Sequence, residues 1–253
     1  MLFRSDGYDD LVVGASGYPD GGAYGKVYVY LGGVDGPGAT PAWVASGPKA
    51  GERFGRAVAG AGDVNADGYA DLVIGAPLGA KVYVYHGRPG GLGPSAAWTK
   101  TGDAGSQFGA AVGAAGDVNG DGTGDLVVGA PLADPAGGVD AGRAYVFYGA
   151  VGGLPGSANW SVDGAAAGNR LGAAVGTAGD ADGDGYADVV IGAYGSDGLA
   201  GQIQLYQGSS GGLAATPGCQ SPQPMATQRV SGRAPGMRTC TNSPPGRLKP
   251  SIA

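Results

Sequence analysis

Oxygen-bearing side chains recur at every second position of three nine-residue stretches. The stretches begin at Asp63, Asp117 and Asp180, and each runs directly into an apolar segment such as DLVIGAP. Ca²⁺ takes about six to eight oxygen ligands, so a short loop that turns carboxylate, amide and carbonyl oxygens inward can hold it. Glycine at the sixth position permits the sharp turn that such a loop needs. The spacing therefore predicts a calcium site in each stretch.

The predicted ligands occupy positions 1, 3, 5, 7 and 9 of each stretch. Position 7 contributes its backbone carbonyl, and the other positions contribute their side chains. The three sets are Asp63, Asn65, Asp67, Tyr69 and Asp71; Asp117, Asn119, Asp121, Thr123 and Asp125; and Asp180, Asp182, Asp184, Tyr186 and Asp188. Without a cation, three or four carboxylates in one loop would repel one another. We expect about three Ca²⁺ ions in all, with the tightest binding in the third loop because it has four carboxylates.

Two other structures share features of these stretches. Asp, Asn and Gly also form turns that need no metal, and a single stretch would not decide between a turn and a site. An EF-hand begins with the same spacing but closes with a glutamate at position 12. That position falls inside a predicted strand here, at Ile74, Val128 and Ile191. The threefold repetition of the acids favours metal binding over a plain turn.

A damaged fourth copy, RSDGYDDLVVGAS, opens the sequence at residues 4–16. It keeps Asp6, the Tyr8 carbonyl and Asp10 at positions 5, 7 and 9. Leu2 and Arg4 stand at its first and third positions, where a calcium loop needs oxygen. We expect no metal in this copy.

No set of residues predicts catalysis. His86 is the only histidine, and its place in the repeat is taken elsewhere by Leu31, Tyr148 and Gln207, which is typical of a variable surface position. The GSSGG stretch at 208–212 matches a nucleophile elbow, but its counterparts GRPGG and GAVGG mark it as a turn. Catalytic metals need an open position beside a substrate cleft, whereas these loops repeat on equivalent connections. We therefore expect a structural metal and no enzyme.

The composition favours an all-β protein. Glycine fills 56 of the 253 positions, and Glu52 is the only glutamate among 21 acidic residues. Aspartate and glycine suit turns, whereas glutamate suits helices. All the acids lie in residues 1–197, so the body of the chain is acidic. Nucleic-acid binding needs clustered Lys and Arg and is not expected.

The chain repeats a unit of four predicted strands. RFG, QFG or RLG (53–55, 107–109, 170–172) precedes each complete acidic stretch, and segments such as KVYVYHG follow it. A tryptophan marks the last strand of the unit at Trp43, Trp98 and Trp160. A repeated four-stranded unit of this length is typical of a β-propeller blade. A β-sandwich, the alternative, would not need such regular repetition.

The boundaries follow from the repeat. We assign residues 1–213 to propeller repeats, with a partial blade at 1–48, blades at 49–102 and 103–165, and a partial blade at 166–213, or about three and a half blades. This gives an expected strand count of three, four, four and three. Residues 214–253 leave the repeat and form a Pro-, Ser- and Arg-rich segment that is predicted to be disordered. The sequence leaves open whether Cys219 and Cys240 pair.

The motif FG, followed by D-x-[DN]-x-D-G-x-x-D and then GAP, resembles the FG-GAP repeat of integrin α-subunit propellers and of many bacterial surface proteins. The resemblance covers about residues 1–213, with departures at Leu171, Ser16 and Tyr194. It implies a propeller that closes with seven blades, ions on one rim that rigidify the blades, and partners that engage elsewhere. On this basis we expect the chain to be part of a larger propeller or to assemble with further blades.

The predicted function is that of a calcium-binding, non-catalytic scaffold for cell adhesion or protein–protein interaction, with a protein or glycan ligand at the cell surface. Calcium sites of extracellular modules have dissociation constants of roughly 10⁻⁴–10⁻³ M, so they fill outside cells. This argues for an extracellular or cell-surface location, although no signal peptide or membrane span is visible. The alternatives are a lectin-type propeller that binds carbohydrate and an accessory propeller of a secreted hydrolase.

Overall fold

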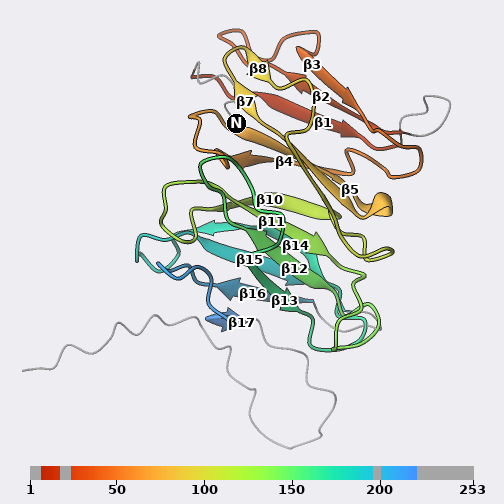
Figure 1. Ribbon diagram of the computed structural model, residues 1–253, viewed down its shortest axis with the longest axis vertical. Coiled ribbons are helices and arrows are strands. Elements are labelled where there is room, and N and C mark those ends of the chain that lie inside the picture. The colour runs from red at the N-terminus through yellow and green to blue at the C-terminus, as the bar shows by residue number, and fades with distance from the viewer. Residues whose placement is uncertain (1–6, 18–23, 196–200, 221–253) are drawn as a thin grey trace, which may run out of the picture.

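The computed structural model describes residues 7–17, 24–195 and 201–220, and its regular structure there is β apart from one 3₁₀ turn. Four antiparallel sheets are stacked face to face in one row (Figure 1). Leu2, Arg4, Asp6 and Cys240 lie outside the described residues, as does nearly all of the segment predicted to be disordered. No helix in the described ranges is both long and apolar enough to cross a membrane.

In each of the four sheets, the strands follow one another in chain order from one edge to the other. Sheet 1 contains β1 (Leu11–Ala15), β2 (Lys26–Tyr30) and β3 (Trp43–Ser46). Sheet 2 contains β4 (Ala57–Gly62), β5 (Asp71–Ala76), β6 (Lys81–Tyr85) and β9 (Trp98–Thr101). Sheet 3 contains β10 (Ala111–Gly116), β11 (Asp125–Ala130), β12 (Arg143–Phe147) and β13 (Trp160–Asp163). Sheet 4 contains β14 (Leu171–Gly179), β15 (Asp188–Ala193), β16 (Gln202–Tyr206) and β17 (Cys219–Gln220). Sheet 2 also carries the 3₁₀ turn η1 (Pro77–Gly79) and a small hairpin of β7 (Gly87–Arg88) and β8 (Gly91–Leu92).

The core lies between the sheets. Successive side chains of a strand point to opposite faces, so Leu72 and Ile74 of β5 pack against sheet 1, whereas Val73 packs against sheet 3. All six residues of β5 and all six of β11 are buried. The continuous apolar runs were predicted to be strands buried on both faces, and the structure confirms this for both.

Glycines let neighbouring sheets approach closely at the turn made by the FG sequences. A Cβ added at Gly75 would lie closer than 3.0 Å to the carbonyl oxygen of Gly109, and one at Gly129 would meet Gly172 in the same way. Gly192 holds the same position in sheet 4, but the nearest atom to its added Cβ is the Ala174 Cβ at 3.3 Å. Backbone therefore packs on backbone at two of these three equivalent glycines.

Sheet 4 differs from the expectation. We predicted three strands that end at residue 213, but β17 pairs with β16 in antiparallel register, so that Cys219 lies opposite Leu205. The Gly-rich turn after β16 returns the chain to the sheet edge, as it does after the third strand of sheets 2 and 3. The expected cue was a tryptophan, and cysteine takes its place. The strand count is therefore four in this sheet, while the division of the chain into blades stays a prediction.

The two outward faces of the row are more exposed than the faces between sheets. Leu11 and Val13 of sheet 1 are 47% and 41% exposed, whereas the equivalent Leu72 and Ile74 of sheet 2 are 0% exposed. At the other end of the row, Ile203 of sheet 4 is 57% exposed. The interior pairs of faces thus account for most of the apolar burial.

Candidate metal centre

The three acidic loops lie side by side along one end of the stacked sheets. Each connects the first and second strands of its sheet. The backbone N–H of Gly124 in the second loop donates to the carbonyl of Asp63 in the first at 2.8 Å. The N–H of Ala187 in the third loop donates to the carbonyl of Asp117 in the second at 2.9 Å. The sheets thus carry a continuous hydrogen-bonded rim of loops.

A β-bulge starts each loop. The register between the first two strands shifts at the end of the first strand in sheets 2, 3 and 4. The last residue of each of these strands is a glycine with positive φ: Gly62 at 78°, Gly116 at 86° and Gly179 at 68°. A bulge bends its strand and re-aims the chain. The glycine-closed bulge therefore turns the first aspartate of each loop inward.

The first aspartate of each loop accepts hydrogen bonds from the loop's own backbone. In the first loop, Asp63 Oδ1 accepts from Asp67 N at 3.0 Å and Oδ2 accepts from Gly68 N at 2.7 Å. Asp117 and Asp180 repeat this pattern, with one further bond each from the glycine at position 4. These bonds wrap the chain around the carboxylate and draw the acids at positions 1 and 5 toward each other.

The ninth-position aspartate has a different place from the other predicted ligands. Asp71, Asp125 and Asp188 are completely buried. One oxygen of each accepts from the N–H at position 2 of its loop, at 2.8–2.9 Å. The other accepts from the glycine N–H that follows the third strand by two residues, also at 2.8–2.9 Å. This carboxylate fastens the loop to the sheet, and its remaining lone pairs are what it can offer to a cation.

Burial raises the pKa of two of these carboxyl groups, because a buried charge loses its hydration. The pKa of Asp71 rises to about 6 and that of Asp125 to about 7, although the backbone hydrogen bonds oppose the rise. The Asp117 and Asp121 charges add to the rise at Asp125. A cation held in the loop would stabilise the charged forms and lower both values.

The third loop brings three carboxylates together. Oxygens of Asp180, Asp182 and Asp184 lie within 4.8 Å of one another, and Asp188 stays outside this cluster. The first and second loops have asparagine at the third position, so an amide oxygen replaces one carboxylate there. Convergent carboxylate and amide oxygens are the ligands of hard cations such as Ca²⁺. The donor set therefore fits calcium at positions 1, 3 and 5, and the carbonyl and ninth-position ligands stay predictions.

Basic side chains are engaged away from the loops. The ion pairs between described residues join Lys81 to Glu52, Arg143 to Asp163 and Arg170 to Asp140. Within the described ranges, no Lys or Arg pairs with an acid at position 1 or 5 of a loop. The negative charge at positions 1 and 5 is thus not neutralised by a basic side chain of the described residues.

The residue after the third strand contacts two of the loops. His86 Nδ1 lies 3.0 Å from Asn65 Nδ2, and its Nε2 is buried. Gln207 Nε2 donates to Asp182 Oδ2. The sequence predicted a variable surface position here, and the structure corrects this: both side chains are half-buried and touch the third ligand of a loop. The signal in the sequence that could have identified these residues is their position directly after the third strand, because the end of that strand lies beside the loop.

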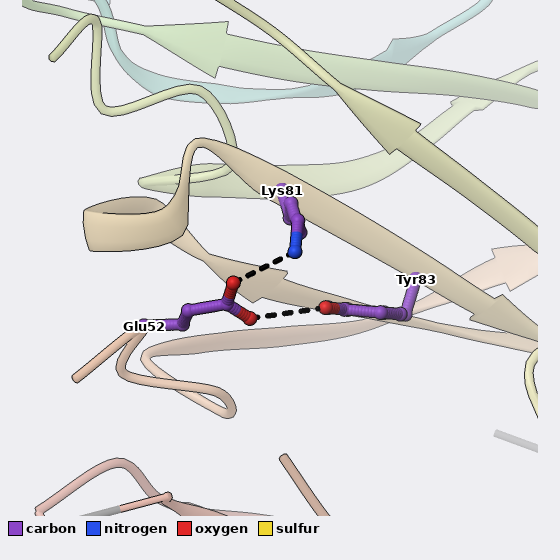
Figure 2. A network of polar contacts seen from close by, with 3 residues as sticks. All are labelled: Glu52, Lys81 and Tyr83. Carbon is purple, nitrogen blue, oxygen red and sulfur yellow. Dashed lines mark hydrogen bonds and ion pairs between the residues drawn. The ribbon is translucent and has the colours of Figure 1, made fainter. Parts of the chain in front are cut away.

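Glu52, the single glutamate, belongs to the opposite end of the sheets. Its carboxylate accepts from Lys81 Nζ at 2.7 Å and from the Tyr83 hydroxyl at 3.2 Å (Figure 2). Burial and the neighbouring Glu52 charge raise the pKa of Tyr83. Glu52 is 5% exposed and is already satisfied by these two donors. It fastens the segment before the FG turn to β6 and is no metal ligand.

Comparison with protein-family models matches the FG-GAP repeat to residues 54–90, 108–147 and 171–206. Each match begins at the FG turn and contains one acidic loop. The second and third matches end with the third strand of their sheet, and the first continues past β6 to residue 90. The chain contains three FG-GAP repeats. The resemblance expected from the motifs is confirmed: the all-β sheets fit the β-propeller architecture of FG-GAP repeats, and the three matches fall on sheets 2, 3 and 4.

The curated relatives of the FG-GAP protein include integrin alpha chains. Integrin alpha-5 of Xenopus laevis is 37% identical over 143 residues, which is 50% of this chain and 14% of the relative. Integrin alpha-4 of the same species is 32% identical over 207 residues, or 77% of this chain and 19% of the relative. Integrin alpha-PS2 of Drosophila melanogaster is 41% identical over 106 residues, or 36% of this chain and 7% of the relative. The chain thus spans less than a fifth of the length of these relatives.

Proposed function

We propose that this FG-GAP protein is a calcium-stiffened, extracellular β-propeller scaffold that binds a protein or glycan partner and has no catalytic activity. The similarity of its repeats to those of integrin alpha chains supports a propeller that serves adhesion or protein binding. The single observation that carries the calcium part is the cluster of Asp180, Asp182 and Asp184. In the other two loops the first aspartate also accepts from the backbone N–H groups at positions 5 and 6, and both loops have carboxylates at positions 1 and 5.

The residues would act by fixing loop geometry. Asp63, Asp117 and Asp180 would each hold a cation together with the side chains at positions 3 and 5 of their loops. A bound Ca²⁺ supplies a positive charge that offsets the repulsion between the carboxylates. Adjacent loops are already joined by backbone hydrogen bonds, so a stiff loop in one blade restrains the loop of the next. Weak sites of this kind fill at extracellular calcium levels, with dissociation constants of roughly 10⁻⁴–10⁻³ M.

The tryptophans argue against the lectin alternative. Trp43, Trp98 and Trp160 each donate the indole N–H to a backbone carbonyl of the next sheet, at 3.0–3.1 Å. Each also packs edge-on against an aromatic ring, with centroids 4.8–5.1 Å apart. These contacts use the indole rings for packing between neighbouring sheets, which is a structural role that needs no sugar.

A binding experiment tests the proposed function. The whole chain is immobilised and probed with a panel of extracellular-matrix proteins and a glycan array, in CaCl₂ and in EDTA. We expect binding to a protein or glycan partner in calcium, and loss of it in EDTA and in the triple variant Asp67→Ala, Asp121→Ala, Asp184→Ala. The matched control is Asp35→Ala, which removes an exposed acid outside the loops.

Glycan binding that survives both EDTA and the triple variant would overturn the proposal in favour of a lectin. Turnover of any glycan or protein in the panel would overturn the non-catalytic assignment.

A further inference from the structure

The residue that directly follows the third strand occupies an equivalent place in sheets 2, 3 and 4: it is His86, Tyr148 and Gln207. In the three-stranded sheet 1 the corresponding residue is Leu31, which follows β2. The glycine after it donates its N–H to the ninth-position aspartate of the same sheet, as Gly87 does to Asp71. This bond holds the end of the third strand against the loop. We call this place the strand-3 exit.

In sheet 4 the strand-3 exit contacts the third-position ligand of the loop. Gln207 Nε2 donates to Asp182 Oδ2, while Asp182 Oδ1 accepts from Asp184 N at 3.2 Å. Both oxygens of Asp182 are therefore held in place by a donor. The same loop is the one whose three carboxylates lie within 4.8 Å of one another.

In sheet 2 the residue at the strand-3 exit, His86, likewise contacts the third-position residue of the loop, which is here the amide side chain of Asn65. Asn65 Nδ2 donates to Asp67 Oδ2 at 2.8 Å and lies 3.0 Å from His86 Nδ1. Because an amide nitrogen is a donor only, His86 Nδ1 is the acceptor in this pair. With its nitrogen turned to these two acceptors, Asn65 presents Oδ1 to the inside of the loop, where Asp67 N donates to it at 3.2 Å.

In sheet 3 the residue at the strand-3 exit, Tyr148, contacts sheet 4 instead of the loop of its own sheet. The Tyr148 hydroxyl accepts from the N–H of Leu213, in the turn that follows the third strand of sheet 4, at 3.0 Å. Asn119 has the same bond to Asp121 as its counterpart in the first loop, 2.9 Å from Nδ2 to Oδ2. No side chain of the strand-3 exit adds to it within the described residues.

We propose that Gln207 and His86 are positioning residues that orient the third ligands Asp182 and Asn65, so that the third and first loops bind calcium more tightly than they would without them. The second loop has no such support. This inference rests on the proposed function, because it assumes that the loops hold calcium. A ligand that is already oriented loses less conformational freedom on binding, and partners behind metal ligands typically change affinity about 10–100-fold when they are removed.

Calcium titration by calorimetry tests this in proteins with one complete loop each. The third loop is kept alone by Asp67→Ala with Asp121→Ala, and the first loop alone by Asp121→Ala with Asp184→Ala. In these backgrounds we expect Gln207→Leu and His86→Leu to weaken calcium binding about tenfold or more. Leucine is the residue that sheet 1 carries at this place. His86→Gln keeps an acceptor for Asn65 and is expected to restore most of the affinity.

The matched control is Tyr148→Phe in a protein that keeps only the second loop, by Asp67→Ala with Asp184→Ala. It removes a hydroxyl at the same place without touching a ligand, so calcium affinity should not change. Melting temperatures in EDTA should be the same for Gln207→Leu, His86→Leu and their parent proteins, because the proposed role is in metal binding.

If Gln207→Leu and His86→Leu bind calcium as tightly as their parents, the positioning role is wrong while the proposed function stands. If they lower the EDTA melting temperature and leave affinity unchanged, the role is structural and the inference is also wrong. If the parents themselves bind no calcium, the proposed function fails, and the inference fails with it.

Discussion

The two ends of the stacked sheets are held together in different ways. At the loop end, buried carboxylates such as Asp125 accept hydrogen bonds from backbone N–H groups, and acids gather above them. At the other end, the FG turns pack backbone against backbone, with Gly75 on Gly109 and Gly129 on Gly172. The stability of the loop end thus depends on charged groups, and that of the turn end depends on close backbone packing. The loop end should therefore respond to pH and cations, and the turn end should not.

The three loops at the loop end hold ten of the 21 acidic residues. At the turn end, neighbouring sheets are packed together by backbone contacts that need no ion. The loops carry carboxylates that repel one another in the absence of a cation. At the turn end, backbone packing fixes the spacing of the sheets. At the loop end, a bound cation would change how rigid the loops are.

The largest effect is expected from Gly129→Ala. Its Cβ would lie closer than 3.0 Å to the backbone of Gly172, so two sheets must move apart. We expect a loss of more than about 4 kcal/mol of unfolding free energy, or failure to fold. Urea denaturation should show the same loss in EDTA and in calcium.

Gly192→Ala is the control, because its Cβ would meet only the Ala174 Cβ at 3.3 Å. Its cost should be below about 1 kcal/mol. Equal losses for the two variants would contradict the close packing of sheets at the turn end.

A smaller effect is expected from pH, and only at the loop end. The folded-state pKa values of Asp71 and Asp125, about 6 and about 7, lie above the value of about 3.9 for an unfolded chain. The folded state therefore binds more protons, and in EDTA this contribution to stability is complete below about pH 4 and is lost as the pH rises through 6 and 7. Between pH 5 and pH 8 we expect the melting temperature in EDTA to fall by at least about 2 °C.

Saturating calcium should remove this fall, because a cation stabilises the charged carboxylates. Asp125→Asn should make the fall in EDTA shallower. Identical pH profiles in EDTA and calcium would show that the buried aspartates do not sense a cation.

The smallest effect is expected from Glu52→Ala at the turn end. The variant removes the acceptor for the buried Tyr83 hydroxyl and for Lys81, whose side chain is 28% exposed and so partly screened. We expect a loss of about 1–2 kcal/mol in urea denaturation, the same with and without calcium. Glu52→Gln keeps an acceptor and should lose less. A loss of stability that calcium reverses would show that Glu52 takes part in the response to calcium, and it would contradict the proposed difference between the two ends.

Repetition made most of the fold predictable. The continuous run from Asp71 to Ala76 and the alternating run from Lys81 to Tyr85 predicted strands, and the structure confirms both. The fourth strand of sheet 4 was missed because Cys219 stands where the other repeats have tryptophan. Such a short edge strand is defined by its hydrogen bonds to β16 and has little periodicity of its own.

The loop ligands were less completely predictable. Local spacing identified the acids that gather in the third loop, because three positions two residues apart must meet in a tight turn. The second role of Asp188 could not be read from spacing, since its partner Gly208 lies 20 residues away. The contacts of His86 and Gln207 were missed for the same reason. Long-range contacts of this kind depend on how a strand end meets a loop.

The most direct test of the account is a calorimetric titration of the whole chain with CaCl₂, with melting curves recorded in calcium and in EDTA. The account predicts three binding events per chain, in the range of roughly 10⁻⁴–10⁻³ M or tighter, and a clear rise in melting temperature with calcium. Asp184→Ala should remove one event and part of the rise. The absence of binding heat, together with identical melting in EDTA and calcium, would show that the loops are turns held by hydrogen bonds alone.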